Sequence, residues 1–110
     1  MRFTTSTRGD LVEIAAAGKL NMASASELRR VVAEAAAPGG ARIVVNLAGT
    51  EFMDSSGLGA LVGCLKTARG AGGDLRIANV QEQVRMVLEL TNMDRIFTPY
   101  PSVETAYDGV

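Results

Sequence analysis

The chain contains no histidine and no tryptophan, and Cys64 is its single cysteine. Without histidine, neither a Ser-His-Asp triad nor a Cys-His pair can form, so these routes of nucleophilic catalysis are excluded. With no histidine and one cysteine, a zinc site would have to be built from carboxylates alone, which is a poor donor set, and we expect no metal. One cysteine cannot form an internal disulfide, so the sequence fits a reducing cytoplasm.

Charge of one sign and long apolar runs are also missing. Eleven basic and twelve acidic residues leave a net charge of −1, without the basic excess that would bind a phosphate backbone. Aromatic residues make up only 5% of the chain, too few for a base-stacking platform. No apolar run approaches the roughly 20 residues that cross a bilayer, and residues 1–6 lack the apolar core of a signal peptide. We therefore expect neither nucleic acid nor a membrane as a partner.

A chain of 110 residues, of which 47% are hydrophobic, is long enough for one packed core and too short for two. No repeat and no low-complexity linker divides it. The sequence therefore predicts a single domain that spans residues 1–110.

The first 17 residues read as two strands joined by a turn at residues 8–10, and Gly18 is expected to end the second strand. The first helix begins either at Ser24, which has the capping-box spacing to Glu27, or one turn earlier with Asn21 as the cap. Strands and helices then alternate. We expect strands at 42–47, 75–78 and 96–98, and helices at 55–69, 80–90 and 101–107. This order predicts an α/β fold whose mixed sheet has an N-terminal hairpin followed by parallel strands, with about four helices.

The most informative segment is Phe-Met-Asp-Ser-Ser-Gly-Leu-Gly at residues 52–59. It follows a β-branched run and precedes an apolar helical pattern, so Asp54 occupies the position of a helix N-cap. Ser55 is then the first helical residue, beside free N–H groups and the positive end of the helix dipole, where a phosphate is readily accommodated. Spacing alone also fits a simpler interpretation, a capped helix with a small-residue entry turn.

Other chemical interpretations of this segment fail on spacing. The third glycine of the run at 57–63 stands one residue late for a dinucleotide fingerprint, and no lysine completes a phosphate-binding loop. The pattern is not Gly-x-Ser-x-Gly either, and a hydrolase would lack its histidine. With no internal base to activate it, Ser55 is better interpreted as a substrate of another protein's active site than as a nucleophile.

Residues 52–59, placed after a strand that ends Asn-Leu, resemble the phosphorylation loop of anti-sigma factor antagonists of the STAS domain family. Upstream, Gly-Lys-Leu-Asn at 18–21 resembles the family's Gly-x-Leu-Asp turn into the first helix. Downstream, a glycine-rich turn, a strand and a helix follow in family order. The resemblance covers nearly the whole chain, and the eight-residue loop is its specific part.

The resemblance implies a phosphorylation-switched binding module with no catalytic residue and no cofactor. It implies that Ser55 accepts the phosphate from an anti-sigma factor serine kinase of the histidine-kinase-like ATPase fold. A metal-dependent serine phosphatase would restore the free hydroxyl. The implied partner-binding residues surround this serine; they are Asn21, Phe52, Met53, Asp54, Ser56, Gly57, Leu58 and Gly59.

Three of these residues carry distinct expectations. Asn21 stands where the family usually has aspartate, so it keeps the capping geometry and loses the negative charge. Gly57 and Gly59 weaken the first turn of a helix. Either a partner backbone approaches them closely, or the helix packs tightly on its own sheet.

Two other functions remain open on the sequence. The chain could be a STAS subunit of another assembly, such as a lipid ABC transporter or a stressosome-like scaffold, with binding indifferent to charge at Ser55. It could also be a small-ligand or nucleotide sensor that uses the helix N-terminus as an anion site, and ligand would then stabilise it by mass action.

Overall fold

The computed structural model describes residues 1–108, which begin with a hairpin of β1 (Arg2–Arg8) and β2 (Leu11–Leu20). Gly9 has a φ of +63° and Asp10 has no positive φ, as in a type II′ turn that matches the strand twist. The prediction that Gly18 ends the second strand is wrong. Gly18 adopts a φ of +119° inside β2, and a side chain there would lie 3.0 Å from the Met1 α-carbon. Glycine therefore allows the strand to continue to Leu20.

Helix α1 (Met22–Ala36) begins at the earlier of the two predicted positions. The Asn21 side chain accepts the N–H of Ala23 at 3.0 Å, and the N–H of Asn21 donates to the Ser24 hydroxyl at 3.0 Å. These reciprocal bonds form a capping box in which Asn21 is the cap and Ser24 is the third helical residue. Leu28 and Val32 lie fully buried on the face of α1 that packs against the sheet.

Strand β3 (Arg42–Met53) is twelve residues long, twice the length predicted. Its register with β2 shifts twice, between Ala15 and Ala17 and between Gly18 and Lys19, and β3 carries the extra residue each time. After Leu47 the buried residues are therefore Thr50 and Met53, at a spacing of three. The apolar run on which the predicted strand rests ends at Leu47, where this spacing begins.

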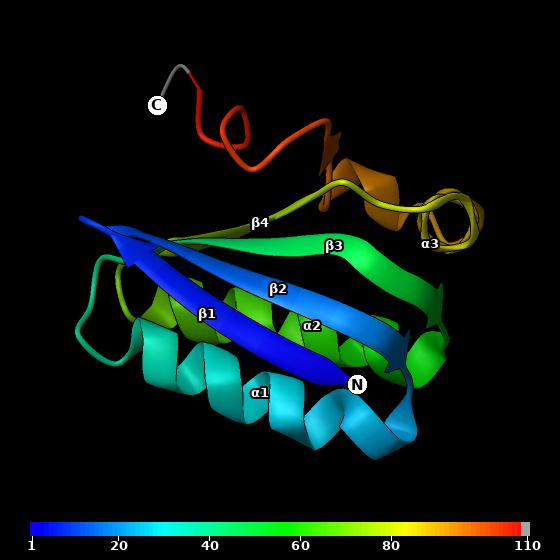
Figure 1. Ribbon diagram of the computed structural model, residues 1–110, viewed down its shortest axis with the longest axis horizontal. Helices are drawn as coiled ribbons and strands as arrows, with labels where there is room; N and C mark the ends of the chain where they lie inside the picture. The colour runs from blue at the N-terminus through cyan, green and yellow to red at the C-terminus, as the bar shows by residue number, and fades with distance from the viewer. Residues whose placement is uncertain (109–110) are drawn as a thin grey trace.

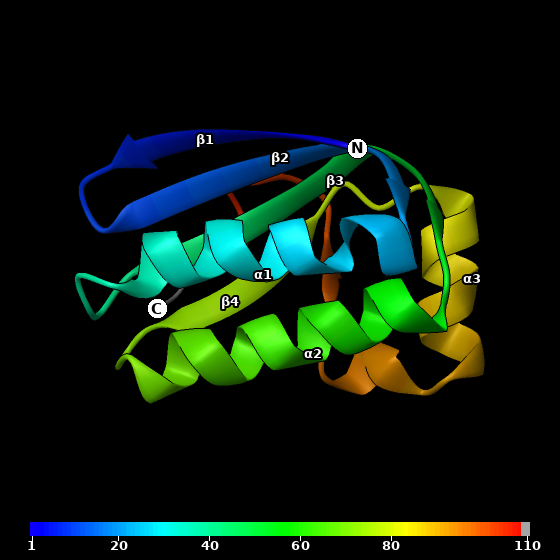
Figure 2. The same cartoon turned by 90° about the horizontal axis from the view of Figure 1, so that it is seen from below.

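The remaining elements complete one five-stranded sheet in the order β1-β2-β3-β4-β5. Only the first pair is antiparallel, so the predicted mixed sheet is confirmed. These elements are α2 (Ser55–Gly70), β4 (Asp74–Ala78), α3 (Glu82–Leu90), a 3-10 turn (Met93–Arg95) and β5 (Pro99–Tyr100). Helices α1 and α2 cover one face of the sheet, and α3 lies beside the C-terminal half of β3 (Figures 1 and 2).

Two predictions for the C-terminal region are wrong. The strand expected at 96–98 lies instead at Pro99–Tyr100, because Phe97 turns into the core. The helix expected at 101–107 is a series of turns, so residues 1–108 contain three α-helices and one 3-10 turn. The Ser102 hydroxyl accepts the N–H of Thr105 at 3.2 Å, which favours a local turn.

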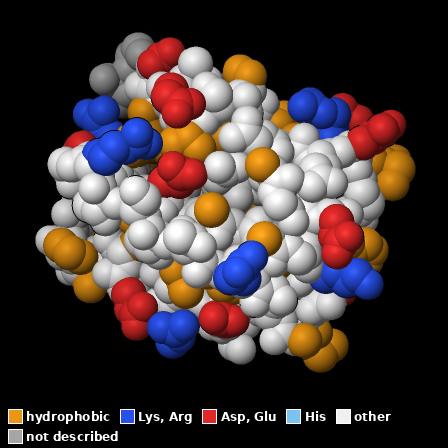
Figure 3. Space-filling view, viewed as in Figure 1, with side chains coloured by type: hydrophobic (Ala, Val, Ile, Leu, Met, Phe, Trp, Pro, Cys, Tyr) orange, Lys and Arg blue, Asp and Glu red, His pale blue; other side chains and the backbone are white. Residues whose placement is uncertain are grey.

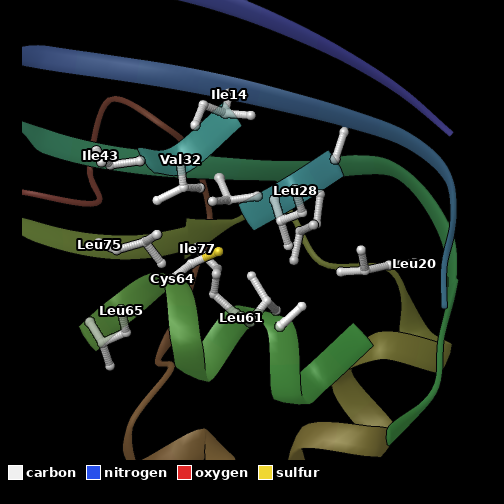
Figure 4. Close-up of a cluster of buried hydrophobic side chains, with 14 of the residues drawn as sticks. Ile14, Leu20, Leu28, Val32, Ile43, Leu61, Cys64, Leu65, Leu75 and Ile77 are labelled. Carbon is white, nitrogen blue, oxygen red and sulfur yellow. The ribbon is translucent and has the colours of Figure 1, made fainter. Parts of the chain in front are cut away.

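The main core lies between the sheet and α1 and α2, where Leu28, Leu61 and Ile77 meet (Figure 4). A smaller core lies on the outer face of the sheet; its buried residues are Val44, Ala78, Val103 and Ala106. Residues 43–45 of β3 are therefore buried on both faces of the sheet, which explains why this part of the strand is apolar throughout.

Two polar side chains hold the C-terminal segment on this outer face. The Tyr107 hydroxyl donates to the Ile43 carbonyl at 2.8 Å. The Arg76 guanidinium donates to the Ala106 carbonyl at 2.7 Å and lies 4.5 Å from the centre of the Tyr107 ring. The segment is thus bound to the sheet by hydrogen bonds, a cation–π contact and buried apolar area.

Candidate functional site

The ends of β2 and β3 bring two helix N-termini side by side. Leu20 pairs with Met53 in the parallel ladder, and the N–H of Asp54 donates to the Leu20 carbonyl at 3.3 Å. Asn21 and Asp54 are the next residues of the two strands and are the N-caps of α1 and α2. Two helices that are distant in the sequence therefore begin side by side at the carboxyl ends of β2 and β3 (Figure 2).

Asp54 fixes the first turn of α2. Its backbone is extended, and its side-chain Oδ1 accepts the N–H of Gly57 at 2.9 Å. Its carbonyl accepts the N–H of Leu58 at 2.9 Å, which is the first intrahelical bond. The N–H groups of Ser55 and Ser56 precede this bond and have no partner within the helix. The first turn therefore combines an acidic cap with two N–H groups that can bind an anion.

The two serines differ in accessibility. Ser55 is exposed at the first helical position, whereas Ser56 is half-buried. Thr50, the nearest preceding hydroxyl, is fully buried and donates to the Ala16 carbonyl at 2.8 Å. Among these three hydroxyls, Ser55 is the one that another protein can reach most directly.

The two glycines of the loop have different surroundings. A side chain on Gly57 would overlap the carbonyl oxygen of Leu20 and lie 2.9 Å from its carbonyl carbon. Gly57 is thus required for α2 to pack on the end of β2. A side chain on Gly59 would meet nothing within 4 Å, so packing within the chain gives no reason for glycine there.

The other residues predicted to bind a partner divide into two groups. Phe52 is 38% exposed. Met22, which was not among the predicted residues, follows Asn21 and is 78% exposed. Met53 and Leu58 are buried, at 1% and 8% exposure, and support the loop from inside the core. In the two segments that meet at this end of the sheet, the exposed large apolar side chains are therefore those of Phe52, near the end of β3, and Met22, at the start of α1.

A side chain that the sequence did not point to also shapes the site. The N–H of Met53 donates to Oε1 of Gln83 at 2.8 Å, and Nε2 of Gln83 donates to the Met53 carbonyl at 3.0 Å. The ladder between β3 and β4 has already ended at Asn46, so the amide of Gln83 takes the place of a neighbouring strand. The only indication of this contact in the sequence is that Gln83, a polar residue, stands next to Val84, which is buried in α3.

Charges of both signs border the site. A groove of about 420 Å³ lies beside the start of α1, and its charged lining residues are Lys19, Glu27 and Glu51. Figure 3 shows basic and acidic side chains interspersed over the visible face rather than gathered by sign.

Within residues 1–108, no group of three or more histidine, cysteine, aspartate or glutamate side chains could hold a metal ion. No helix in this part of the chain is long and apolar enough to span a membrane.

Comparison with known proteins gives the family to which this chain belongs. The family model for the STAS domain matches residues 2–106, and the chain belongs to the STAS domain family. The anti-sigma-B factor antagonist of Staphylococcus epidermidis is 31% identical over 93 residues, which cover 84% of this chain and 86% of that protein.

Solved structures agree with this assignment. A candidate anti-sigma factor antagonist from Thermotoga maritima superposes with a TM-score of 0.87 at 30% identity, covering 98% of this chain and 93% of that chain. The Bacillus cell fate determinant SpoIIAA in its phosphorylated form has a TM-score of 0.69 at 22% identity. That comparison covers 94% of this chain and 96% of SpoIIAA, and at this identity it shows a shared fold.

Proposed function

We propose that this protein is an anti-sigma factor antagonist whose binding is switched by phosphorylation of Ser55. Without phosphate, it binds an anti-sigma factor and thereby releases a sigma factor; with phosphate, it does not bind. The observation that carries the proposal is the exposed Ser55 at the first position of α2, directly after the Asp54 cap. Membership of the STAS family and the names of its relatives support it.

In this proposal Ser55 is a substrate, and the protein is not an enzyme. The chain has no histidine that could remove the hydroxyl proton. The base and the ATP therefore come from the partner, an anti-sigma factor serine kinase of the histidine-kinase-like ATPase fold. A metal-dependent serine phosphatase returns the hydroxyl. The proposal places these reactions in the cytoplasm.

The magnitudes favour a switch in binding over a switch in fold. A phosphate at a helix N-terminus gains about 0.3–1 kcal/mol from the helix dipole, and the nearby Asp54 carboxylate offsets part of this. The same charge about 4 Å from a partner's negative group costs ~1 kcal/mol in water-like surroundings and ~4 kcal/mol at intermediate dielectric. Because about 1.4 kcal/mol is a tenfold change in affinity, the partner complex is far more sensitive than the fold.

The test combines mapping with binding. The protein is incubated with an anti-sigma factor kinase from the same genome and ATP, and the modified peptide is identified by mass spectrometry. Binding of the kinase to Ser55→Ala, Ser55→Asp and the control Ser56→Ala is then measured. We expect phosphate on Ser55, binding by both alanine variants, and loss of binding by Ser55→Asp with its melting temperature nearly unchanged.

Three results would contradict the proposal. Phosphate confined to Ser56 or Thr50 would remove Ser55 from its role. Binding by Ser55→Asp as tight as that of the wild type would remove the electrostatic switch. A stable complex with proteins other than a kinase, indifferent to charge at Ser55, would instead indicate a STAS subunit of another assembly.

A further inference from the structure

Strand β1 leaves one long edge of the sheet open. It pairs with β2 over all seven residues, and no strand of residues 1–108 lies on its other side, which is the open upper side of β1 in Figure 2. The opposite edge, β5, has only two residues and begins with proline. An open edge strand carries a row of unpaired N–H and C=O groups, which can pair with another strand.

The hydrogen bonds of β2 reveal which backbone groups of β1 face outward. The carbonyls of Asp10, Ala16 and Leu20 all accept bonds from β3 or from its end. The backbone N–H and C=O groups of successive residues in a strand point to opposite neighbouring strands, so those of the even-numbered residues of β2 point towards β3. The odd-numbered residues of β2 therefore face β1.

The register then assigns each residue of β1. Residues 11, 13, 15 and 17 of β2 pair with residues 8, 6, 4 and 2 of β1, so these even-numbered residues of β1 bond inward. The N–H and C=O groups of Phe3, Thr5 and Thr7 consequently face the open edge. These groups are ready to pair with an added strand.

The side chains of β1 indicate what kind of strand fits. Residues 3–7 are uncharged and consist of phenylalanine, threonine and serine, which suit strands. The strand has no proline, lysine or register shift that would block an edge. Arg2 and Arg8 lie at its two ends, both exposed and on the same face. Arg8 is 3.8 Å from Glu13, whereas Arg2 makes no ion pair within residues 1–108.

We propose that the β1 edge binds an extended segment of a partner protein, which adds to the sheet as a sixth strand. The segment has an uncharged β-forming centre and carboxylates opposite Arg2 and Arg8. A second copy of this chain is a poorer occupant. The register that pairs all seven residues would place Arg2 opposite Arg8 at both ends, and like charges directly opposite are destabilising. This surface is independent of Ser55.

The test uses a capped peptide, Asp-Thr-Val-Thr-Val-Thr-Asp, and a control peptide with lysine at both ends. Amide hydrogen exchange of the full chain is followed by NMR. The aspartate peptide should slow exchange at Phe3, Thr5 and Thr7 and leave Thr4 and Ser6 unchanged, because those two already bond to β2. Added salt should weaken this protection, since the end contacts are ionic.

Two variants at one position separate edge pairing from loss of fold. Thr5→Pro removes an outward N–H without removing a bond to β2, and proline is tolerated on that side of an edge strand. Thr5→Val keeps the N–H. We expect Thr5→Pro to lower the peptide affinity at least about fivefold, the effect of one lost hydrogen bond, while Thr5→Val changes it little.

The wild-type exchange pattern decides the question even if Thr5→Pro does not fold. Unchanged exchange at Phe3, Thr5 and Thr7 with the aspartate peptide would overturn the proposal. If the lysine peptide slowed amide exchange at these residues equally, the inference that the partner segment carries carboxylates would be overturned. Protection that grows with protein concentration and needs no peptide would show that the occupant is a second copy.

Discussion

Gly57 and Gly59 stand two residues apart in one helical turn, and their substitution should change stability in opposite directions. Gly57→Ala places a methyl group against the Leu20 carbonyl, which should destabilise the fold by about 1–3 kcal/mol, the usual effect of overpacking. Gly59→Ala meets open space and gains helix propensity, so it should stabilise by up to about 1 kcal/mol. Urea unfolding of both variants measures the difference.

The same pair also tests why glycine stands at residue 59. If a partner backbone approaches α2 closely, Gly59→Ala will weaken binding to the anti-sigma factor while it strengthens the fold. Equal unfolding midpoints for the two variants would contradict the packing assigned to Gly57.

Asn21→Asp restores the carboxylate that the family usually carries. Asparagine and aspartate cap helices about equally well, so the free energy of unfolding should change by only a few tenths of a kcal/mol. If residue 21 meets a basic residue of the kinase, the new charge will speed association and make it more sensitive to salt. Stopped-flow association rates at two salt concentrations provide the measurement. Unchanged rates and salt dependence would mean that residue 21 serves only as a cap.

Cys64 links stability to alkaline pH. Burial raises the pKa of its thiol from 9.0 to about 11, and the nearby Arg29 lowers it only in part. The pKa of the thiol is higher in the folded state than in the unfolded state, so folding favours the protonated thiol. The contribution of the thiol to the free energy of unfolding is therefore fully present below pH 9 and is lost as pH rises through 11. Between these values the thiol should reduce the free energy of unfolding by about 1.4 kcal/mol per pH unit.

The control for Cys64 is Cys64→Ala, which lacks the titrating group. It should be less stable at neutral pH because of the cavity, yet its free energy of unfolding should fall less steeply between pH 9 and 11. Parallel pH profiles for the two proteins would show that the thiol titrates normally in the fold.

At the scale of elements, the side chain of Gln83 in α3 holds Met53, the last residue of β3. Gln83→Ala removes both hydrogen bonds to Met53, each of which stabilises by about 1 kcal/mol. We expect faster amide exchange at Met53 and slower phosphorylation of Ser55, because the strand end that presents the serine is no longer held. The matched control is Gln81→Ala, which loses one bond from the N-cap of α3 to the Ala48 carbonyl, farther along β3 from the serine. Equal effects of both variants on phosphorylation would show that α3 acts only on general stability.

Elements with local signals were predictable from the sequence. Asp54 and Asn21 were identifiable as caps because a cap bonds within three residues of itself. The second half of β3 was not predictable, because the apolar run ends at Leu47 and the two register shifts leave only every third residue buried beyond it. The prediction of a C-terminal helix was wrong for a related reason. Val103 and Ala106 have helical spacing, but they are buried against the sheet by a turn.

At the scale of the whole molecule, the site depends on contacts that no local pattern contains. The bond between Gln83 and Met53 joins residues thirty positions apart. The contact between Gly57 and Leu20 requires β2 and β3 to end together. The sequence therefore located Ser55 and its cap, whereas the support beneath them became visible only in the folded chain.

The outer-face core formed by Val44, Ala78, Val103 and Ala106 has a consequence for the order of events during synthesis. The ribosome releases a chain from its N-terminus, so the strands and helices of the main core are available before residues 103–107. Until those residues arrive, Val44 and Ala78 face water on the bare side of an otherwise finished sheet. During synthesis the domain therefore exposes apolar side chains on one face of its sheet, and a chaperone can bind this face until residues 103–107 cover it.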